Sequence, residues 1–345
     1  MCMTKVRQAV VMVGGQGTRL MPLTKNRPKS ILPVLDKPCI RYLIESMAGS
    51  GVEEMILACG HRTSQFEEAI GDGSDIGISI EYSFEDEPLG TGGAIKKLEN
   101  RLDDVFIAAN GDVLADISLE EQIRKHFSSG AEVTIALTSV DNPCEFGIAR
   151  LDEEEKIIEF KEKPKPEEVF SNLVNAGIYI INKTALAYTT ENKFDFSKDL
   201  LPSLMKEQKI VQGFPLSGTW RDVGRPKDLL GANLSMASKL YDQMSWGGNR
   251  VGSTTIRKPF YLGKGASVTG SDVYAAVVME NSFVTGSKLT NTMIFRDCTI
   301  SSAKIENSII GEGCKVGPGA EIIASVIGDG MTINAGRKIE NEKVG

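Results

Sequence analysis

The last third of the chain carries aliphatic residues at a period near six, and this spacing restricts the fold more than any other feature of the sequence. Leu262 and Val268 lie six residues apart, as do Ile294 and Ile300. Ile310, Val316 and Ile322 continue the spacing, and Ile327 and Ile333, again six apart, close it. A six-residue period is typical of a parallel β-helix, in which one aliphatic side chain from each flat side faces the core.

The chain therefore divides into a repetitive tail and a longer part without repeats. We expect about five coils of roughly eighteen residues each, with an irregular register between Tyr274 and Leu289. Trp246-Gly247-Gly248-Asn249 has the composition of a linker. The predicted organisation is a first domain over 1–245, a linker over 246–250 and a β-helix domain over 251–345.

In the first domain, apolar strands alternate with helical patterns, which is the mark of an α/β fold with a doubly wound, Rossmann-like sheet. The expected strands cover 8–13, 54–59, 76–82 and 105–109, and the expected helices cover 38–50 and 63–70. From Gly130 the pattern changes to strands alone, over 132–140, 147–151, 156–160 and 174–181. Ligands of such sheets bind beyond the carboxyl ends of the strands.

The first strand ends in a glycine-rich loop followed by two cations. Gly14, Gly15 and Gly17 allow the backbone to approach a ligand closely. Their N–H groups, together with Arg19 and Lys29, suit a polyphosphate. The loop has neither the G-x-x-x-x-G-K-[ST] nor the G-x-G-x-x-G spacing, which makes a dinucleotide-dependent oxidoreductase a poor alternative.

The loop and the segment after it resemble the signature of the sugar-1-phosphate nucleotidylyltransferases, G-G-x-G-T-R-L-x-P-L-T followed by R-P-K-x-L-x-P-V. The matching stretches run from Gly14 to Thr24 and from Arg27 to Val34. The resemblance implies that Gly14, Gly15, Gly17 and Thr18 bind the nucleotide. It also implies that Arg19 steadies the leaving pyrophosphate and that Lys29 balances the α-phosphate.

Two aspartates complete the expected catalytic set. Asp112 follows the strand that ends at Ala109, and Asp222 stands between apolar residues of Trp220-Arg221-Asp222-Val223-Gly224. The resemblance implies that both hold Mg²⁺. Magnesium commonly takes one or two carboxylates and completes its shell with phosphate oxygens and water. The role of Arg225, where related enzymes often carry a small or neutral residue, stays open.

A second glycine-rich stretch, Leu89-Gly90-Thr91-Gly92, resembles the segment that holds the nucleobase in this family, which assigns Gly90 and Thr91 to nucleotide binding. Glu87 precedes it in a Glu-Pro pair like that of the guanylyltransferase branch. A carboxylate there can accept from both N–H groups of guanine, whereas thymine or uracil offers one.

Four residues resemble the family's binding set for the sugar phosphate. They are Gly147, Glu162, Lys163 and Asn175. The family's Glu-Lys-Pro motif implies that Glu162 binds sugar hydroxyls and that Lys163 binds the phosphate. The segment from Phe194 to Pro202 resembles a helix entry of the family, for which we expect a structural role.

The implied reaction joins a nucleoside triphosphate and a sugar 1-phosphate into a nucleotide sugar and releases pyrophosphate. GTP with mannose 1-phosphate is the preferred pair, because Trp220 and the residues after it read most like the mannose enzymes. The alternatives are glucose 1-phosphate with dTTP or UTP, and a catalytically silent regulatory subunit. A silent copy need not retain Arg19, Lys29, Asp112, Lys163 and Asp222 together.

Composition and charge set the remaining expectations. A net charge of −7 argues against a general nucleic-acid binder. No apolar stretch reaches the length of a membrane span, and the first residues lack a secretory pattern. The six scattered cysteines favour reduced thiols in a cytoplasmic protein. Both histidines, His61 and His126, precede the β-helix, which leaves it without a base for acetyl transfer, so we expect it to mediate homo-oligomer assembly or regulation.

Overall fold

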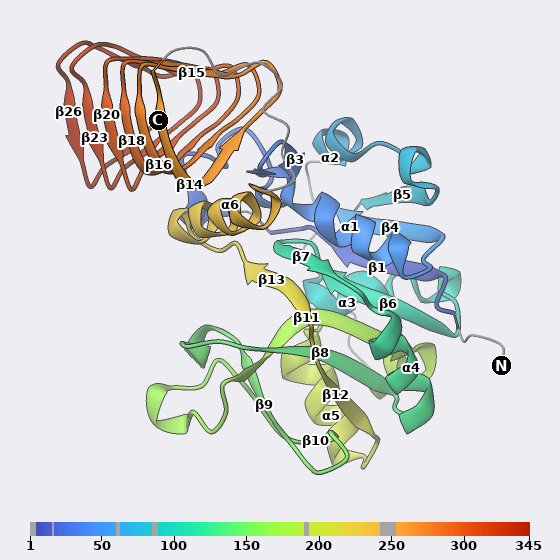
Figure 1. Ribbon diagram of the computed structural model, residues 1–345. Coiled ribbons are helices and arrows are strands. Elements are labelled where there is room, and N and C mark those ends of the chain that lie inside the picture. Colours follow the sequence, from blue (N-terminus) through green and yellow to red (C-terminus); the bar gives the residue numbers. More distant parts are fainter. Residues whose placement is uncertain (1–4, 16, 60–62, 85–88, 190–192, 242–252) are drawn as a thin grey trace. The chain divides into compact units, whose positions relative to one another are not determined.

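The computed structural model describes residues 5–15, 17–59, 63–84, 89–189, 193–241 and 253–345. The chain folds into two compact units (Figure 1). Unit 1 comprises 1–15 and 40–220, and unit 2 comprises 16–39 and 221–345. The chain therefore leaves unit 1 after the glycine loop begins, and returns to it with the first helix.

The first half of unit 1 is a parallel α/β layer, as expected. Strand β1 (Gln8–Met12) pairs in parallel with β4 (Glu54–Cys59) and β6 (Val105–Asn110), and β4 pairs in parallel with β5 (Ser79–Phe84). The connecting helices are α1 (Cys39–Gly49), α2 (Thr63–Ile70) and α3 (Gly90–Lys96). The first four residues of β1 are buried, and the strand lies inside the sheet between β4 and β6.

The second half adds antiparallel strands, so the sheet is mixed rather than wholly parallel. Strand β11 (Leu173–Asn182) pairs antiparallel with β6 on one side and with β8 (Val133–Ser139) on the other. The remaining elements are β7 (Val113–Ile117), α4 (Glu120–Ser129), β9 (Gly147–Leu151), β10 (Ile157–Glu162), α5 (Leu201–Lys206), β12 (Val211–Pro215) and β13 (Gly218–Asp222). The change from alternating elements to strands near Gly130 is confirmed.

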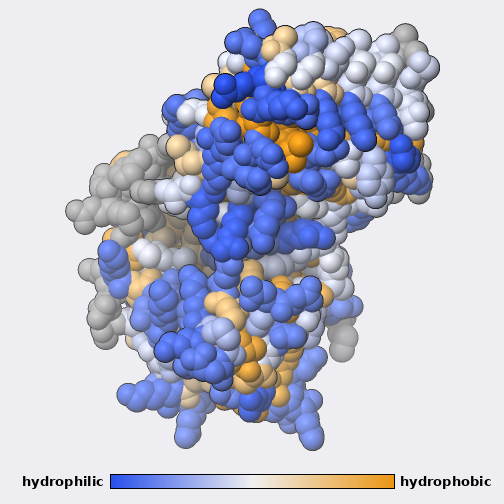
Figure 2. All heavy atoms as spheres, turned by 90° about the vertical axis from the view of Figure 1, so that its left-hand side faces the viewer, coloured by the Kyte–Doolittle hydropathy of each residue, from blue (hydrophilic) through white to orange (hydrophobic). Residues whose placement is uncertain are grey.

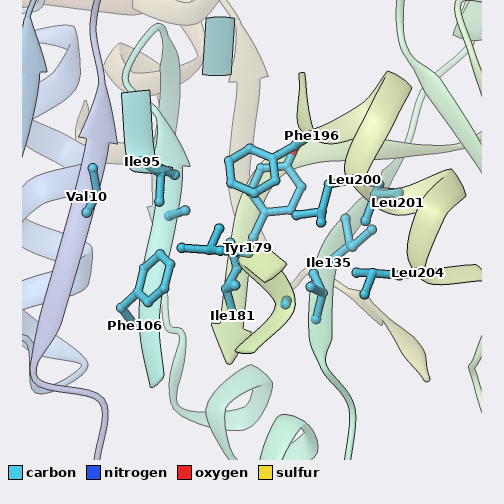
Figure 3. Close-up of a cluster of buried hydrophobic side chains, with 14 of the residues drawn as sticks. Val10, Ile95, Phe106, Ile135, Tyr179, Ile181, Phe196, Leu200, Leu201 and Leu204 are labelled. Carbon is cyan, nitrogen blue, oxygen red and sulfur yellow. The ribbon is translucent and has the colours of Figure 1, made fainter. Parts of the chain in front are cut away.

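One hydrophobic core joins the two halves of this sheet (Figure 3). Val10, Phe106 and Ile181 come from three neighbouring strands and are buried. Tyr179 of β11 stacks on Phe196, with ring centroids 5.2 Å apart. This stack ties the segment after residue 193 to the middle of the sheet.

Unit 2 begins with the segment 17–39, which contains 3₁₀ turns at Thr18–Leu20 and Lys29–Ile31 and a short hairpin of β2 (Pro33–Val34) with β3 (Lys37–Pro38). Helix α6 (Pro226–Leu240) holds the hairpin. The side chain of Asn233 accepts a hydrogen bond from the Leu35 N–H at 2.6 Å and donates to the Pro33 carbonyl at 3.2 Å. Helix α6 has Pro226 at its first position, where the missing N–H of proline costs nothing.

The rest of unit 2 is a solenoid of parallel strands (Figure 1). One sheet stacks β14 (Thr255–Leu262), β16 (Asp272–Val278), β18 (Lys288–Ile294), β20 (Lys304–Glu306), β21 (Ile309–Ile310), β23 (Glu321–Ile323), β24 (Val326–Ile327), β26 (Lys338–Glu340) and β27 (Lys343–Val344). The other stacks β15 (Ser267–Thr269), β17 (Phe283–Thr285), β19 (Thr299–Ser301), β22 (Lys315–Val316) and β25 (Thr332–Ile333). The β-helix inferred from the six-residue period is confirmed.

The coils are shorter than expected. Val273 lies beside Leu289, 16 positions on, and Ile305 lies beside Ile322, 17 positions on, so the estimate of roughly eighteen residues was too long. The corners of the coils contain residues with positive φ, such as Asn281, Asn291 and Asn307 (φ 49°). Some intervals between buried aliphatic residues are five positions rather than six, as from Val268 to Val273 and from Val273 to Val278. These shorter intervals explain the register that looked irregular after Tyr274.

The predicted domain boundaries differ from the two compact units. The proposed linker, 246–250, lies outside the described residues. The structure groups 16–39 and helix α6 with the solenoid, whereas the sequence pattern placed both in the first domain. None of the described helices is long and apolar enough to cross a membrane. Hydrophilic side chains cover most of the face that Figure 2 presents, as the content of 25% charged residues leads one to expect.

Candidate active site

In unit 1, the start of the glycine loop and Asp112 lie at the same edge of the sheet. Strands β1 and β6 are parallel neighbours, and the Gly111 N–H donates to the Met12 carbonyl at 2.9 Å. Gly14 and Gly15 follow β1 and are exposed, and Asp112 follows β6 and is half-buried. The rule that parallel strands present their carboxyl ends together therefore holds for these residues.

In unit 2, Gly17 of the glycine loop packs against Thr24 and Lys29. Gly17 has φ +62°, and a Cβ built on it would lie 2.9 Å from the Cβ of Lys29 and 3.1 Å from a methyl carbon of Thr24. The Thr24 hydroxyl donates to the Gly17 carbonyl at 2.8 Å. A glycine is required here for both conformation and space.

Two basic side chains, Arg19 and Lys29, lie near the carboxylate of Asp222 in the same unit. Lys29 Nζ lies 3.7 Å from Asp222 Oδ1, and the lysine side chain is only 7% exposed. A Cβ built on Gly224 would lie 2.7 Å from Asp222 Oδ2 and 3.3 Å from a guanidinium nitrogen of Arg19. Arg19, Lys29 and Asp222, far apart in the sequence, thus share one site within unit 2.

The two predicted metal ligands have the chemistry of a hard divalent cation site. Asp112 in unit 1 and Asp222 in unit 2 each offer carboxylate oxygens, the ligand type that Mg²⁺ prefers, and Mg²⁺ commonly needs only one or two of them from a protein. Over the part of the chain that the structure describes, no group of three histidine, cysteine or acidic side chains is close enough to hold a metal. Phosphate oxygens and water would therefore have to complete the shell.

The Glu-Lys pair of the expected sugar-phosphate site lies at the end of β10. Glu162 pairs with Gly147 of β9, and a Cβ on Gly147 would meet Glu162 Oε2 at 2.7 Å. Burial raises the pKa of the Glu162 carboxyl, while Lys163 and a hydrogen bond from Ser197 oppose the rise. Lys163 has φ 47°, and its N–H donates to the Phe146 carbonyl at 2.9 Å.

Asn175 is held by hydrogen bonds within the same region. Its amide nitrogen donates to the Tyr179 hydroxyl at 2.8 Å and to the Ser197 hydroxyl at 3.1 Å, and its oxygen accepts from the Gly177 N–H at 2.9 Å. Burial raises the pKa of Tyr179 to about 12, so its hydroxyl stays protonated. Ser197 thereby links Asn175 to Glu162.

Trp220 borders these residues from β13. Its indole N–H donates to the Ala176 carbonyl at 2.9 Å, and its ring packs edge-to-face on Phe146 at 6.0 Å between centroids. Gly147, Glu162, Lys163 and Asn175 are thus brought together in unit 1, with an aromatic pair beside them.

The second glycine-rich stretch has an internal role in addition to the one predicted. The Thr91 hydroxyl donates to Asp195 at 3.2 Å and accepts from the Phe196 N–H at 3.1 Å. A Cβ on Gly90, which has φ +77°, would lie 2.6 Å from the Phe194 carbonyl oxygen. Thr91 therefore fastens the stretch to the segment 194–196, and Gly90 lies too close to Phe194 for any side chain. Glu87 lies outside the described residues.

Sequence reasoning missed two residues of this region. Ser197 was assigned with its neighbours to a structural role, yet it hydrogen-bonds to Asn175 and Glu162. Arg27 was read only as part of the R-P-K motif, yet it pairs with solenoid carboxylates. A small polar residue beside an aromatic helix entry gives no signal of its own, and Arg27 lies 302 positions from one partner.

A mixed α/β sheet with a glycine loop at its edge in unit 1, and two cations near Asp222 in unit 2, agree with the class of enzyme expected from the sequence. The chain matches the family described as "Nucleotidyl transferase" over residues 8–239, and it belongs to that family. Residues 274–344 match "GlmU-like, C-terminal hexapeptide". The expected class of enzyme is confirmed.

Named relatives agree with this class. The chain is 33% identical over 335 residues to a mannose-1-phosphate guanylyltransferase of Mycobacterium tuberculosis, covering 96% of this chain and 82% of that protein. It is 34% identical over 277 residues to a probable mannose-1-phosphate guanylyltransferase 2 of Oryza sativa, covering 77% and 75%.

A solved structure shares the fold. It is the crystal structure of a putative glucose-1-phosphate thymidylyltransferase from Bacillus anthracis in complex with a sucrose. The TM-score is 0.61 at 24% identity, and the match covers 70% of this chain and 98% of the other. At that identity the likeness establishes the fold and leaves the substrate to other arguments.

Proposed function

We propose that this enzyme transfers GMP from GTP to mannose 1-phosphate, giving GDP-mannose and pyrophosphate. The observation that carries nucleotidyl transfer is the placement of Arg19 and Lys29 beside Asp222, because two cations next to a metal-binding carboxylate suit a polyphosphate. The choice of GTP and mannose rests on relatives named for that activity, at 33% and 34% identity.

The reaction is a displacement at the α-phosphorus of GTP. A phosphate oxygen of mannose 1-phosphate forms the new P–O bond, and the bond from the α-phosphorus to the bridging oxygen breaks. The electron pair leaves on pyrophosphate. Both reactants are anionic, so their mutual repulsion is the main obstacle, and positioned positive charge is the main remedy.

The side chains divide this work. We assign the backbone N–H groups of Gly14, Gly15 and Gly17 to the triphosphate, with Thr18 beside them, Arg19 to the departing pyrophosphate and Lys29 to the α-phosphate. Lys29 is suited to its role because its side chain is buried and its ammonium lies 3.7 Å from Asp222 Oδ1. Members of this family generally use a divalent metal. We assign Asp112 and Asp222 to Mg²⁺, which neutralises phosphate charge when bound.

The sugar phosphate would bind at the end of β10. We assign Lys163 to its phosphate, and Glu162 and Asn175 to the sugar hydroxyls. Gly147 leaves room for Glu162, since any side chain there would collide with the carboxylate. Ser197 holds Glu162 and Asn175 together, so we add it to the site. Gly90, Thr91 and Glu87 are assigned to the guanine end.

The test is a pyrophosphate-release assay over a grid of GTP, ATP, UTP, dTTP and CTP against mannose, glucose and N-acetylglucosamine 1-phosphates, in saturating Mg²⁺. We expect the highest kcat/KM for GTP with mannose 1-phosphate. A preference for dTTP or UTP with glucose 1-phosphate would replace this substrate pair. A silent regulatory subunit would release no pyrophosphate in any cell of the grid.

The solenoid supports a second proposal, that the protein forms a homo-oligomer through its β-helix. Stacked coils leave backbone groups unpaired at the ends of the stack, and these favour pairing with another subunit. Light scattering of the full chain measures the mass directly, and a monomer at all accessible concentrations would contradict the proposal.

A further inference from the structure

The solenoid makes direct contact with the segment that carries Arg19 and Lys29. Both belong to unit 2, although the segment 17–39 precedes the solenoid by more than two hundred positions in the sequence. Asp36 accepts hydrogen bonds from the Tyr261 hydroxyl at 2.5 Å and from the Glu280 N–H at 3.1 Å. Lys343 Nζ donates to the Arg19 carbonyl at 3.1 Å.

The strongest of these contacts centres on Arg27. One guanidinium nitrogen lies 2.9 Å from Glu312 Oε2 and the other lies 2.5 Å from Asp329 Oδ2, so the side chain bridges two consecutive coils. The ring of Phe295 lies 5.9 Å from the guanidinium carbon. The Arg27 side chain is 19% exposed and that of Asp329 is 18% exposed, so the pair is largely shielded from solvent.

The partners of Arg27 are themselves fixed. Arg296 Nε lies 2.9 Å from Glu312 Oε1, and the Glu312 N–H donates to Asp329 Oδ1 at 2.9 Å. Burial alone would raise the pKa of the Glu312 carboxyl, but Arg296 and Arg27 outweigh burial and lower it. The Glu312 carboxyl is therefore charged at neutral pH, which strengthens its hydrogen bonds to the two arginines.

The position of Arg27 determines that of Lys29, because only Pro28 separates them. Proline fixes its own φ near −65°, and Pro28 has φ −59° and ψ 149° as it enters the turn Lys29–Ile31. The Lys29 Cβ then packs against Gly17, and its ammonium reaches Asp222. Two ends of one short rigid segment are thus held, one by the solenoid and the other at the candidate phosphate site.

We propose that Arg27, clamped by Glu312 and Asp329 of the solenoid, is a positioning residue that aims Lys29 at the reacting phosphate. The aim of Lys29 rests on the function proposed above; the clamp itself does not. Arg27 contacts carboxylates of the protein and reaches the substrate only through Lys29. On this proposal the solenoid supports the nucleotide site, in addition to the homo-oligomer assembly proposed above.

The first test compares Arg27→Met with Arg41→Met. Arg41 is a matched control because it is 12% exposed and pairs with two carboxylates, Glu45 and Asp75, within unit 1. Both variants lose a shielded arginine, so both lose stability. We expect Arg27→Met to lower kcat about tenfold or more with GTP and mannose 1-phosphate, and Arg27→Lys to restore part of it. We expect Arg41→Met to stay within about twofold of the parent.

A double-mutant cycle identifies the route of the effect. If Arg27 acts through the solenoid, the variant Glu312→Gln with Asp329→Asn should lower kcat in a protein that keeps Arg27. The same two changes should lower kcat little further in a protein that already carries Arg27→Met. The proposal is overturned if Arg27→Met matches Arg41→Met in kcat. It is also overturned if the carboxylate variants leave kcat unchanged while Arg27→Met lowers it, since Arg27 would then act on the substrate directly.

Amide hydrogen exchange tests the clamp without any turnover. The Ile31 N–H donates to Pro28 and the Leu32 N–H to Lys29, so both report the turn. We expect them to exchange at least about tenfold faster in Arg27→Met and at parental rates in Arg41→Met. Unchanged exchange overturns the clamp. If the parent enzyme releases no pyrophosphate while Arg27→Met exchanges faster, the proposed function fails and the clamp stands.

Discussion

Gly15→Ala separates the needs of a bound nucleotide from the needs of the fold. Among the residues that the structure describes, no heavy atom lies within 4 Å of a Cβ built on Gly15 or Gly14. Neither glycine has a positive φ, so alanine fits without strain. Such a change leaves stability unaltered or raises it by up to about 1 kcal/mol, because the unfolded chain loses freedom.

We expect a bound nucleotide to change this result. If the loop holds the triphosphate as proposed, a methyl group at Gly15 would crowd the approach of a phosphate to the backbone N–H groups. A hydrogen bond to a charged group contributes about 1.5–3 kcal/mol. At about 1.4 kcal/mol for each factor of ten, the loss of one such bond lowers kcat/KM for GTP between about 10-fold and about 150-fold. We therefore expect a large kinetic defect in a protein of normal stability.

Gly17→Ala is the comparison from the same loop. Its φ of +62° and the 2.9 Å approach to Lys29 Cβ make alanine both strained and crowded. The strain costs about 1–2 kcal/mol and the overpacking about 1–3 kcal/mol, so this variant loses stability as well as activity. Pyrophosphate release gives kcat/KM and the urea midpoint gives stability. A Gly15→Ala enzyme that keeps kcat/KM within about twofold would refute a role for this backbone in phosphate binding.

Three further predictions concern single side chains. Asp112→Asn should lower turnover by orders of magnitude, and near-normal pyrophosphate release in saturating Mg²⁺ would contradict the metal assignment. Burial lowers the pKa of His126 in the folded state, so on acidification the unfolded state binds a proton that the folded state does not. The contribution of His126 to the free energy of unfolding is therefore highest above about pH 6.5 and falls below it. Urea midpoints at about pH 7.5 and about pH 5.5 should show a smaller difference in His126→Gln, and an equal difference would refute this. Ile322→Ala should cost about 2–5 kcal/mol, because Ile322 is fully buried among the coils; calorimetry measures the loss, and an unchanged melting temperature would argue against that packing.

Periodic features were predictable from the sequence because each rests on local spacing. Val268, Ile300 and Val316 are buried in the solenoid, as the six-residue period required. The length of the coils was not predictable to the residue, because intervals of five and six positions alternate irregularly between the buried aliphatic residues. A coil with two five-residue intervals, such as the one that begins at Val268, has 16 residues in place of about eighteen.

The candidate site was predictable to the extent that motifs and strand ends specify it. Asp112 lies at the sheet edge beside the end of β1 because parallel neighbours end together. The approach of Lys29 to Asp222, and the hydrogen bonds of Ser197, depend on long-range packing that no local pattern encodes. The assignments to nucleotide, sugar phosphate and metal stay predictions.

The clamp at Arg27 also has a consequence for biosynthesis. Arg27 and Asp329 are separated by 302 positions, and a ribosome adds about 5–20 residues per second. Arg27 is therefore synthesised roughly 15–60 s before Asp329. If Arg27 positions Lys29 as proposed, a nascent chain that has already formed its sheet still lacks the contacts that hold this lysine. We therefore expect full activity only after the coils that carry Glu312 and Asp329 have folded.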